Sequence, residues 1–171
     1  RYQNRAVQEL GRSALFAIAQ DDKSLRSYSI PPEVLSAAEM YQAAVDKTWK
    51  GTTQNYTRIQ EPFAQGFGFL GEWGVCQYLD EIKIPYHYET ADPEDSDKIE
   101  FTIYEKKYDT KTGSKFFHKH LAFPEAQRDE RVDFYIGCRL IGLTAVEVWG
   151  IESVGDAIVD AFGGHVRIRD V

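Results

Sequence analysis

The most informative segment of this chain is Asp97-Lys-Ile-Glu-Phe-Thr-Ile-Tyr-Glu-Lys-Lys-Tyr-Asp-Thr-Lys111. It opens with an acid and closes with Asp109 and Lys111, and the apolar residues of 99–103 recur at every second position, which predicts a strand. Successive strand residues point to opposite faces and rise by roughly 3.3 Å each, so Asp109 and Lys111 would project from one face about 7 Å apart. A carboxylate beside an ammonium at a strand end can hold a divalent cation and a water together.

The turn between the two predicted strands decides which acids share a face. A two-residue turn would put Asp109 opposite Glu100, with Asp97 on the other side of the sheet. A three-residue loop would instead bring Asp97, Asp109 and Lys111 to one face, because one residue of slip reverses every side chain. We predict the odd-length loop, or a β-bulge with the same effect, and keep Glu100 beside Asp109 as the fallback pair.

A glycine-punctuated helix is predicted upstream, over residues 66–81. Glycine costs about 1 kcal/mol in a helix interior, so Gly71 and Gly74 need an explanation. Close approach of the helix to a sheet or to a phosphate backbone would provide one. Glu72 shares a helix face with Cys76 at i, i+4, so this glutamate is directed either into a site or at the margin of the buried face.

Together these elements resemble the PD-(D/E)XK nuclease superfamily, over roughly residues 66–151. Asp97 matches the first acid, Asp109-Thr110-Lys111 matches the acid-x-lysine half, and Ser96 stands where the family often has proline. Acid-x-lysine alone is common in this chain. It recurs at Asp21/Lys23, Glu81/Lys83 and Glu105/Lys107, but only the Asp109 pair follows a strand and a glutamate-bearing helix.

The resemblance implies an α/β fold with a restriction-endonuclease-like αβββαβ core, in which helices flank a mixed sheet. The core would span residues 66–171, with residues 1–65 as a helical N-terminal extension packed on it, in one structural unit. The implied activity is that of a Mg²⁺-dependent deoxyribonuclease.

The resemblance also implies the roles of the site residues. Mg²⁺ or Mn²⁺ would be held by Glu72, Asp97, Asp109 and the carbonyl of Thr110, and the metal would acidify a bound water. Lys111 would orient or deprotonate that water and stabilise the charge that builds on the phosphate. The tract His118-Lys-His120 is a competing metal site, although no third ligand can be named for it.

The charge of the chain bears on its partners. A net charge of −7 argues against indiscriminate nucleic-acid binding, yet the segment 106–120 is locally basic. The lysines expected to contact DNA phosphates are Lys106, Lys107, Lys115 and Lys119. The alternative function is a catalytically inactive relative of the nuclease fold that acts as a nucleic-acid-binding or assembly module. DNA is the expected partner, a homodimer is left open, and no membrane is expected.

Length and composition favour one ordinary globular domain. The chain has 171 residues, of which 43% are hydrophobic and 27% charged, and no apolar run approaches the roughly 20 residues of a membrane span. Cys76 and Cys138 lie in apolar contexts typical of free thiols in a reducing compartment, which predicts a cytoplasmic location.

The remaining elements follow from their patterns. Helices are predicted over 4–20 and 32–50, with Pro32 in the first turn and Gly51 beyond the end. Strands are predicted over 85–89, 132–139 and 145–151, a short helix over 156–162, and an edge strand over 165–171. The segment 114–128 is left unassigned.

Overall fold

The protein is described here by a computed structural model that covers residues 26–48, 62–90, 92–94, 99–114, 120–124, 130–153, 158–159 and 165–170. It is a mixed α/β structure. The helices are α2 (Pro32–Thr48) and α4 (Ala64–Glu81). The strands are β1 (Arg26–Ser29), β2 (His87–Tyr88), β3 (Phe101–Ile103), β4 (Lys106–Gly113), β5 (His120–Pro124), β6 (Phe134–Ile141), β7 (Ala145–Ser153), β8 (Ile158–Val159) and β9 (His165–Asp170).

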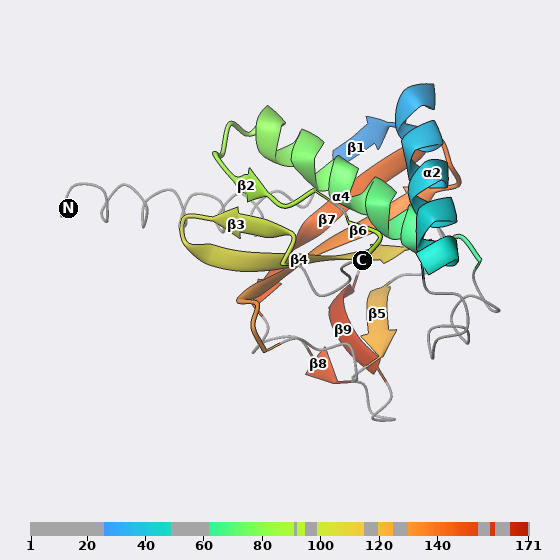
Figure 1. Cartoon of the computed structure of the whole chain (residues 1–171). Coiled ribbons are helices and arrows are strands. Elements are labelled where there is room, and N and C mark those ends of the chain that lie inside the picture. Colours follow the sequence, from blue (N-terminus) through green and yellow to red (C-terminus); the bar gives the residue numbers. More distant parts are fainter. Residues whose placement is uncertain are drawn as a thin grey trace.

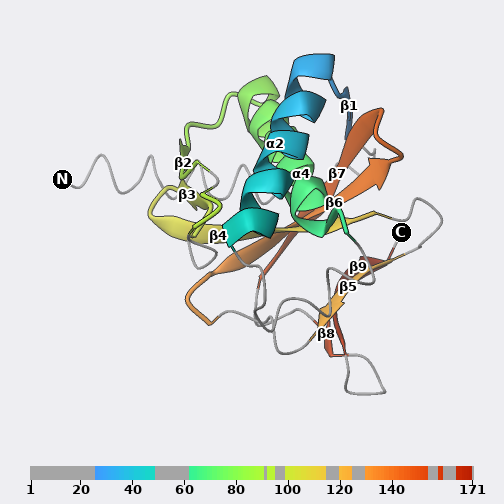
Figure 2. The same cartoon turned by 45° about the vertical axis from the view of Figure 1, so that its right-hand side comes forward.

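Two sheets organise these strands. The larger has six strands in the order β1-β7-β6-β4-β3-β2, and the smaller has three in the order β5-β9-β8. Helix α4 packs directly on the large sheet against β4, β6 and β7, and α2 packs on α4. Both helices therefore lie on one face of the large sheet, and the small sheet lies on the side away from them (Figures 1 and 2).

The large sheet is mixed. Strand β4 runs parallel to β6, and every other pairing within this sheet is antiparallel. The predicted helix 66–81 is confirmed as α4, and the strands predicted at 85–89, 132–139 and 145–151 are present as β2, β6 and β7. The α/β class is therefore as predicted, with a curled six-stranded sheet at its centre.

The β3–β4 hairpin corrects the predicted register. Ile103 pairs with Lys106, so the connection is the two-residue turn Tyr104-Glu105, and the predicted three-residue loop is wrong. Both turn residues have positive φ, 47° and 66°. Tight hairpins favour this geometry because its twist matches that of the strands. The two turn residues are then usually Asn-Gly or Asp-Gly. Tyr-Glu carries no such signal.

The segment predicted as a helical extension contributes a strand as well as a helix. Strand β1 pairs with β7 and forms one edge of the large sheet, which the sequence prediction missed. The predicted helix 32–50 is present as α2. The predicted helix 4–20 and much of the predicted extension lie outside the described residues, so the division at residue 65 stays a prediction.

The C-terminal part differs from prediction in two ways. Ile158–Val159 form strand β8, where a short helix over 156–162 was predicted. The predicted strand 165–171 is confirmed as β9, but it lies between β5 and β8 rather than at an edge. Strand β5 falls in the unassigned segment 114–128.

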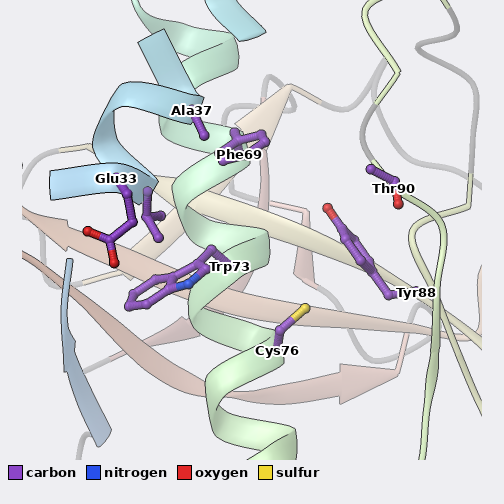
Figure 3. A pocket seen from close by; sticks show the side chains of 8 residues that line it. Glu33, Ala37, Phe69, Trp73, Cys76, Tyr88 and Thr90 are labelled. Carbon is purple, nitrogen blue, oxygen red and sulfur yellow. The ribbon is translucent and has the colours of Figure 1, made fainter. Parts of the chain in front are cut away.

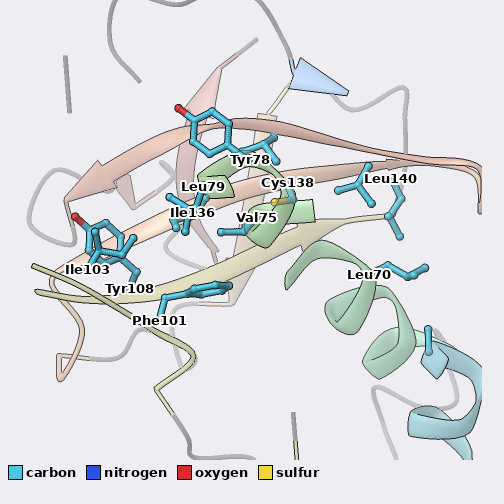
Figure 4. Close-up of a cluster of buried hydrophobic side chains, with 13 residues drawn as sticks. Leu70, Val75, Tyr78, Leu79, Phe101, Ile103, Tyr108, Ile136, Cys138 and Leu140 are labelled. Carbon is cyan, nitrogen blue, oxygen red and sulfur yellow. The ribbon is translucent and has the colours of Figure 1, made fainter. Parts of the chain in front are cut away.

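The core lies between α4 and the large sheet (Figure 4). Its fully buried side chains include Leu70, Val75 and Leu79 of α4, Phe101 and Ile103 of β3, Ile136, Cys138 and Leu140 of β6, and Val146 of β7. Each fully buried side chain of this size stabilises the fold by roughly 1.5–3 kcal/mol relative to an exposed one. This packing fixes the height of α4 above β4.

Two glycines allow helix α4 to lie this close to the sheet. A Cβ at Gly71 would lie 1.9 Å from Thr112 Oγ1, and a Cβ at Gly74 would lie 2.5 Å from Val146 Cγ1. Contacts this short are impossible for real side chains, so the helix rests on β4 and β7 through bare backbone. Of the two predicted explanations for these glycines, close approach to a sheet or to a phosphate backbone, the first is the one that the structure shows.

We expect Gly71→Ala to destabilise the protein by about 1–3 kcal/mol, because β-branched Thr112 cannot move aside without shifting β4. Gly68→Ala is the matched control, since its Cβ meets nothing within 4 Å and alanine is the better helix former by about 1 kcal/mol. Thermal unfolding measures both, at about 2–4 °C per kcal/mol for a chain of this size. Equal melting temperatures for the two variants would contradict the close approach.

Candidate functional site

The first residue of the site is a buried glutamate of helix α4. Glu72 lies on α4 between the two close-approach glycines, and only 8% of it is exposed. Its carboxyl group is hydrogen-bonded to the carboxyl group of Glu100. Two carboxyl groups can share a hydrogen bond only when one of them carries the proton.

Glu100 lies where the β3–β4 hairpin opens. The ladder between the two strands ends at Phe101, while β4 continues beyond it to Gly113. The carboxylate of Glu100 takes the place of the missing strand, because its Oε2 accepts a hydrogen bond of 2.8 Å from the backbone N–H of Thr110. On its other side the Glu100 carbonyl accepts from the Glu89 N–H at 2.9 Å. The acid is thus held firmly at the open end of the hairpin. This open end, occupied by Glu100, Asp109 and Lys111, is the fork.

Burial and neighbouring charge act on both glutamates. Burial, and next the negative charge of Asp109, raise the pKa of Glu72, while its hydrogen bond to Glu100 partly offsets the rise. Burial, followed by the charges of Glu72 and Asp109, holds the pKa of Glu100 well above its usual range, although the bond from Thr110 opposes this. The two side chains therefore retain protons at pH values where exposed glutamates are ionised.

Asp109 and Lys111 form the other half of the site. Lys111 Nζ lies 2.9 Å from Asp109 Oδ2, with both side chains 19% exposed, and 5.7 Å from the centre of the Tyr135 ring. The alternate residues Tyr108 and Thr112 face α4. Asp109 and Lys111 therefore project from the opposite face of the sheet.

Glu100 connects the two halves. It interacts electrostatically with Glu72 on the helix side and with Asp109 on the other side. This is possible because it stands at the opening of the hairpin, where no β3 residue separates the two faces. Glu100 thus links the helix glutamate on one face to the acid-x-lysine pair on the other.

The predicted site residues fare differently in the structure. Glu72 and the Thr110 N–H hydrogen-bond Glu100, and Asp109, which pairs with Lys111, acts on Glu100 electrostatically. Asp97 lies outside the described residues, and the loop length that was to bring it to the face of Asp109 is wrong. The residue that occupies the fork is Glu100, the fallback partner.

The predicted DNA-contacting lysines lie at the turn end of the hairpin where they are described. Lys106 Nζ lies 4.0 Å from Asp133 Oδ1, and the Lys107 N–H donates to Asp133 Oδ2 at 2.9 Å. The Lys107 side chain is exposed. Lys115, Lys119 and His118 fall outside the described residues, as does the side chain of His120. Asp133 thus offsets part of the positive charge expected here.

The site contains carboxylate oxygens of the kind that bind a divalent cation, but they are not arranged as a complete coordination sphere. Among the described residues, no group of three or more His, Cys, Asp and Glu side chains is arranged to hold a metal ion. Glu100 and Asp109 nevertheless supply carboxylate oxygens, and Mg²⁺ usually takes only one or two protein carboxylates. The cation would have to compete with Lys111 for Asp109 and with a proton for Glu100.

The raised pKa of Glu72 gives a test in the absence of metal. Below about pH 4 Glu72 is protonated in both the folded and the unfolded chain. Above that pH the unfolded chain releases this proton, whereas the folded chain retains it. Stability is therefore lost as the pH rises toward the folded-state pKa, by about 1.4 kcal/mol per pKa unit of difference. Glu72→Gln removes this titration and can still hydrogen-bond Glu100.

We expect Glu72→Gln to gain stability relative to the parent as the pH is raised from about 5 to about 8. Urea unfolding at a series of pH values measures the difference, with Glu39→Gln on the exposed side of α2 as control. A difference between Glu72→Gln and the parent that stays constant across this range would show that Glu72 is ionised in the folded protein.

Comparisons with protein-family models, with curated proteins and with solved structures give no match. Neither of the two helices in the described part of the chain has the length and apolar character needed to cross a membrane. A function is therefore inferred from the geometry of the fork.

Proposed function

We propose that this chain is a divalent-metal-dependent DNA nuclease with a restriction-endonuclease-like core, and that it hydrolyses phosphodiester bonds at Glu100, Asp109 and Lys111. The observation that carries the proposal is the fork itself. One acid lies at the opening of the hairpin, acid-x-lysine follows on the next strand, and Glu72 of α4 hydrogen-bonds the first acid.

The roles follow from position. Glu100 and Asp109, with the carbonyl of Thr110, would hold Mg²⁺ or Mn²⁺, and Glu72 would support Glu100 from behind. When bound, the cation supplies positive charge to a phosphate oxygen and lowers the pKa of a water. Lys111 lies two residues from Asp109 on the same face, where its ammonium can orient the attacking water and stabilise charge on the phosphate.

The topology supports the proposed core in part. A glutamate-bearing helix precedes an antiparallel hairpin, and the acid-x-lysine strand pairs in parallel with β6, as in a mixed nuclease sheet. One difference is that both helices of the described part lie on the same face of the sheet. Another is that strand β5 lies between β4 and β6 in the chain, where the αβββαβ order has a helix.

DNA contacts and location belong to the same proposal. Exposed Lys107 is a candidate phosphate contact, and Lys115 and Lys119 extend the basic segment along the sequence. A cytoplasmic location is supported by the free thiols of Cys76 and Cys138. Because the net charge is −7, we expect the protein to recognise a particular DNA structure at one site rather than to bind DNA non-specifically.

The direct test is cleavage of a DNA panel with and without Mg²⁺ or Mn²⁺. The panel holds duplex, single-stranded, end-frayed and branched substrates of one sequence, labelled at both ends. Metal-dependent cleavage of at least one substrate, abolished by chelation, is the expected result. Absence of cleavage across the whole panel with both metals would contradict the proposal.

A second function, a catalytically inactive nucleic-acid-binding or assembly module, is favoured by a separate observation. Lys111 already pairs with Asp109 at 2.9 Å, and Glu72 already hydrogen-bonds Glu100. These charged and polar groups are therefore paired with one another without a cation. In that case the protein would bind DNA or a second copy of itself with no dependence on metal. Binding without cleavage on the same panel would identify this function.

A further inference from the structure

A groove lined by α2, α4 and β2 lies on the helix-covered side of the large sheet (Figure 3). Its volume is about 220 Å³ and its lining is largely apolar. Three aromatic side chains line it, Phe69 and Trp73 from α4 and Tyr88 from β2. Exposed Glu33, from the first turn of α2, lies at its rim. No residue of the fork is among the described residues that line the groove, so it is a separate site.

The aromatic rings are held in position by the protein itself. Tyr88 is stacked on Phe101, with ring centres 4.8 Å apart and planes at 29°, so one face of Tyr88 is covered and its orientation is restricted. Phe69 contacts the Tyr41 ring, with centres 5.5 Å apart, and both Phe69 and Trp73 are partly buried against the core. A ligand that contacts these rings therefore costs the protein little side-chain freedom.

Negative charge acts on both ends of the groove. At the Phe69 end, burial raises the pKa of Tyr41 to about 12, and the charges of three acids add to the rise. These acids are Glu72, Glu100 and Asp92. At the other end, burial raises the pKa of Cys76, which lines the groove, to about 11, and the charges of Asp80 and Glu72 add to the rise. The described lining includes no lysine, arginine or histidine, so the groove favours a positively charged ligand.

The apolar lining narrows the kind of cation. A metal ion or a primary ammonium would lose its water in the groove and find few oxygen atoms to replace it, which is costly. A quaternary ammonium group has no N–H to satisfy, and the face of an aromatic ring attracts it when the cation lies within about 6 Å of the ring centre. Pockets for drug-sized ligands are roughly 300–1,000 Å³. A volume of about 220 Å³ therefore suits a smaller molecule.

We propose that the groove binds a small molecule with a quaternary ammonium group, whose methyl groups contact the three aromatic rings. Glu33 lies at the rim, where its carboxylate offsets part of the positive charge. In Figure 3 Trp73 and Glu33 lie on one side of α4 and Tyr88 lies on the other. Asp109 and Lys111 project from the opposite face of the sheet, so this second site does not depend on the proposed nuclease activity.

Two probes of the same shape and different charge test the proposal. They are choline and its uncharged carbon analogue dimethylbutanol, in which a quaternary carbon replaces the nitrogen. NMR titrations of the full chain measure both affinities from the methyl signals of the probes. The indole N–H signal of Trp73, identified by its loss in Trp73→Leu, reports whether the probe binds in the groove. We expect choline to shift this signal and to bind about tenfold more tightly than its analogue.

Two variants separate the aromatic and the carboxylate contributions. Trp73→Leu keeps an apolar side chain but removes the ring, so it should weaken choline binding about tenfold and change the affinity for the analogue by no more than a few-fold. Glu33→Gln, at an exposed position, should weaken choline binding about threefold at low salt and leave the analogue unaffected. Glu39→Gln, exposed on the same helix and outside the groove, is the control and should change neither affinity.

Three results would overturn the proposal. The first is equal affinity of the parent protein for choline and its analogue, which would leave only an apolar groove. The second is a Trp73 signal that choline does not shift. The third is a preference for choline that persists in Trp73→Leu, which would put the cation elsewhere. The DNA cleavage panel tests the fork alone, so either proposal can fail while the other stands.

Discussion

Lys111→Ala is expected to lower the rate of metal-dependent DNA cleavage by about 10²- to 10³-fold, which is the usual loss when one positioned charge donor is removed from such a site. DNA affinity should be retained, and metal binding should be as strong as in the parent or stronger, because the ammonium competes for Asp109 and is not itself a metal ligand. Single-turnover cleavage with saturating enzyme separates the rate from the affinity.

Lys47→Ala is the matched control for this experiment. Lys47 is an exposed lysine in the last turn of α2, so its loss removes one positive charge without touching the fork. It should cleave at the parent rate. Cleavage by Lys111→Ala within a few-fold of Lys47→Ala would remove Lys111 from the reaction.

Mg²⁺ or Mn²⁺ is expected to raise the melting temperature of the protein, because an ion that binds only the folded state stabilises it by mass action. At a metal concentration about 100 times the dissociation constant, the gain is about 2.7 kcal/mol, or roughly 5–10 °C for a chain of this size. Asp109→Asn should abolish most of this shift and the cleavage together, since Asp109 would supply one of the two metal-binding carboxylates.

The comparison must be between metal-induced shifts, because Asp109→Asn also removes the ion pair with Lys111. Asp46→Asn, at an exposed position on α2, is the control that keeps the fork intact. Calorimetry of each protein with and without metal gives the two shifts. Equal shifts in Asp109→Asn and Asp46→Asn would place the metal elsewhere in the chain.

Much of the scaffold around the fork was predictable from periodicity. The helix 66–81 and the strands 132–139 and 145–151 carry apolar residues at the spacing that their structures require. The glycines of α4 were predictable as points of close contact, because glycine in a helix interior needs a compensating reason. Each of these predictions needs only the local sequence.

The register of the hairpin was not predictable, and it decides which acid occupies the fork. Tyr104 and Glu105 adopt positive φ in a turn that usually selects Asn and Gly, so tertiary context overrides the local preference. The sequence therefore favoured Asp97 and held Glu100 only as the fallback. A shift of one residue in the turn is enough to exchange the two.

Strand β1 was missed for a different reason. Arg26-Ser-Tyr-Ser29 is short and mostly polar, and its partner β7 is more than a hundred residues away in the sequence. Its place is supported by contacts with the end of α4, since Arg26 Nη1 lies 2.9 Å from Glu81 Oε1 and the Tyr28 hydroxyl donates to the same carboxylate. Only the folded chain brings these groups together.

Whether Glu100 belongs to the active site is tested most directly by Mg²⁺-dependent cleavage by Glu100→Gln, compared with Glu105→Gln in the exposed hairpin turn. Glutamine at position 100 keeps an oxygen that can accept from the Thr110 N–H, so the fork should retain its shape while losing the charge that would hold the metal. We predict that Glu100→Gln cleaves about 10²-fold more slowly or worse, and that Glu105→Gln cleaves at the parent rate. Equal cleavage by the two variants would contradict the assignment of Glu100 to the active site.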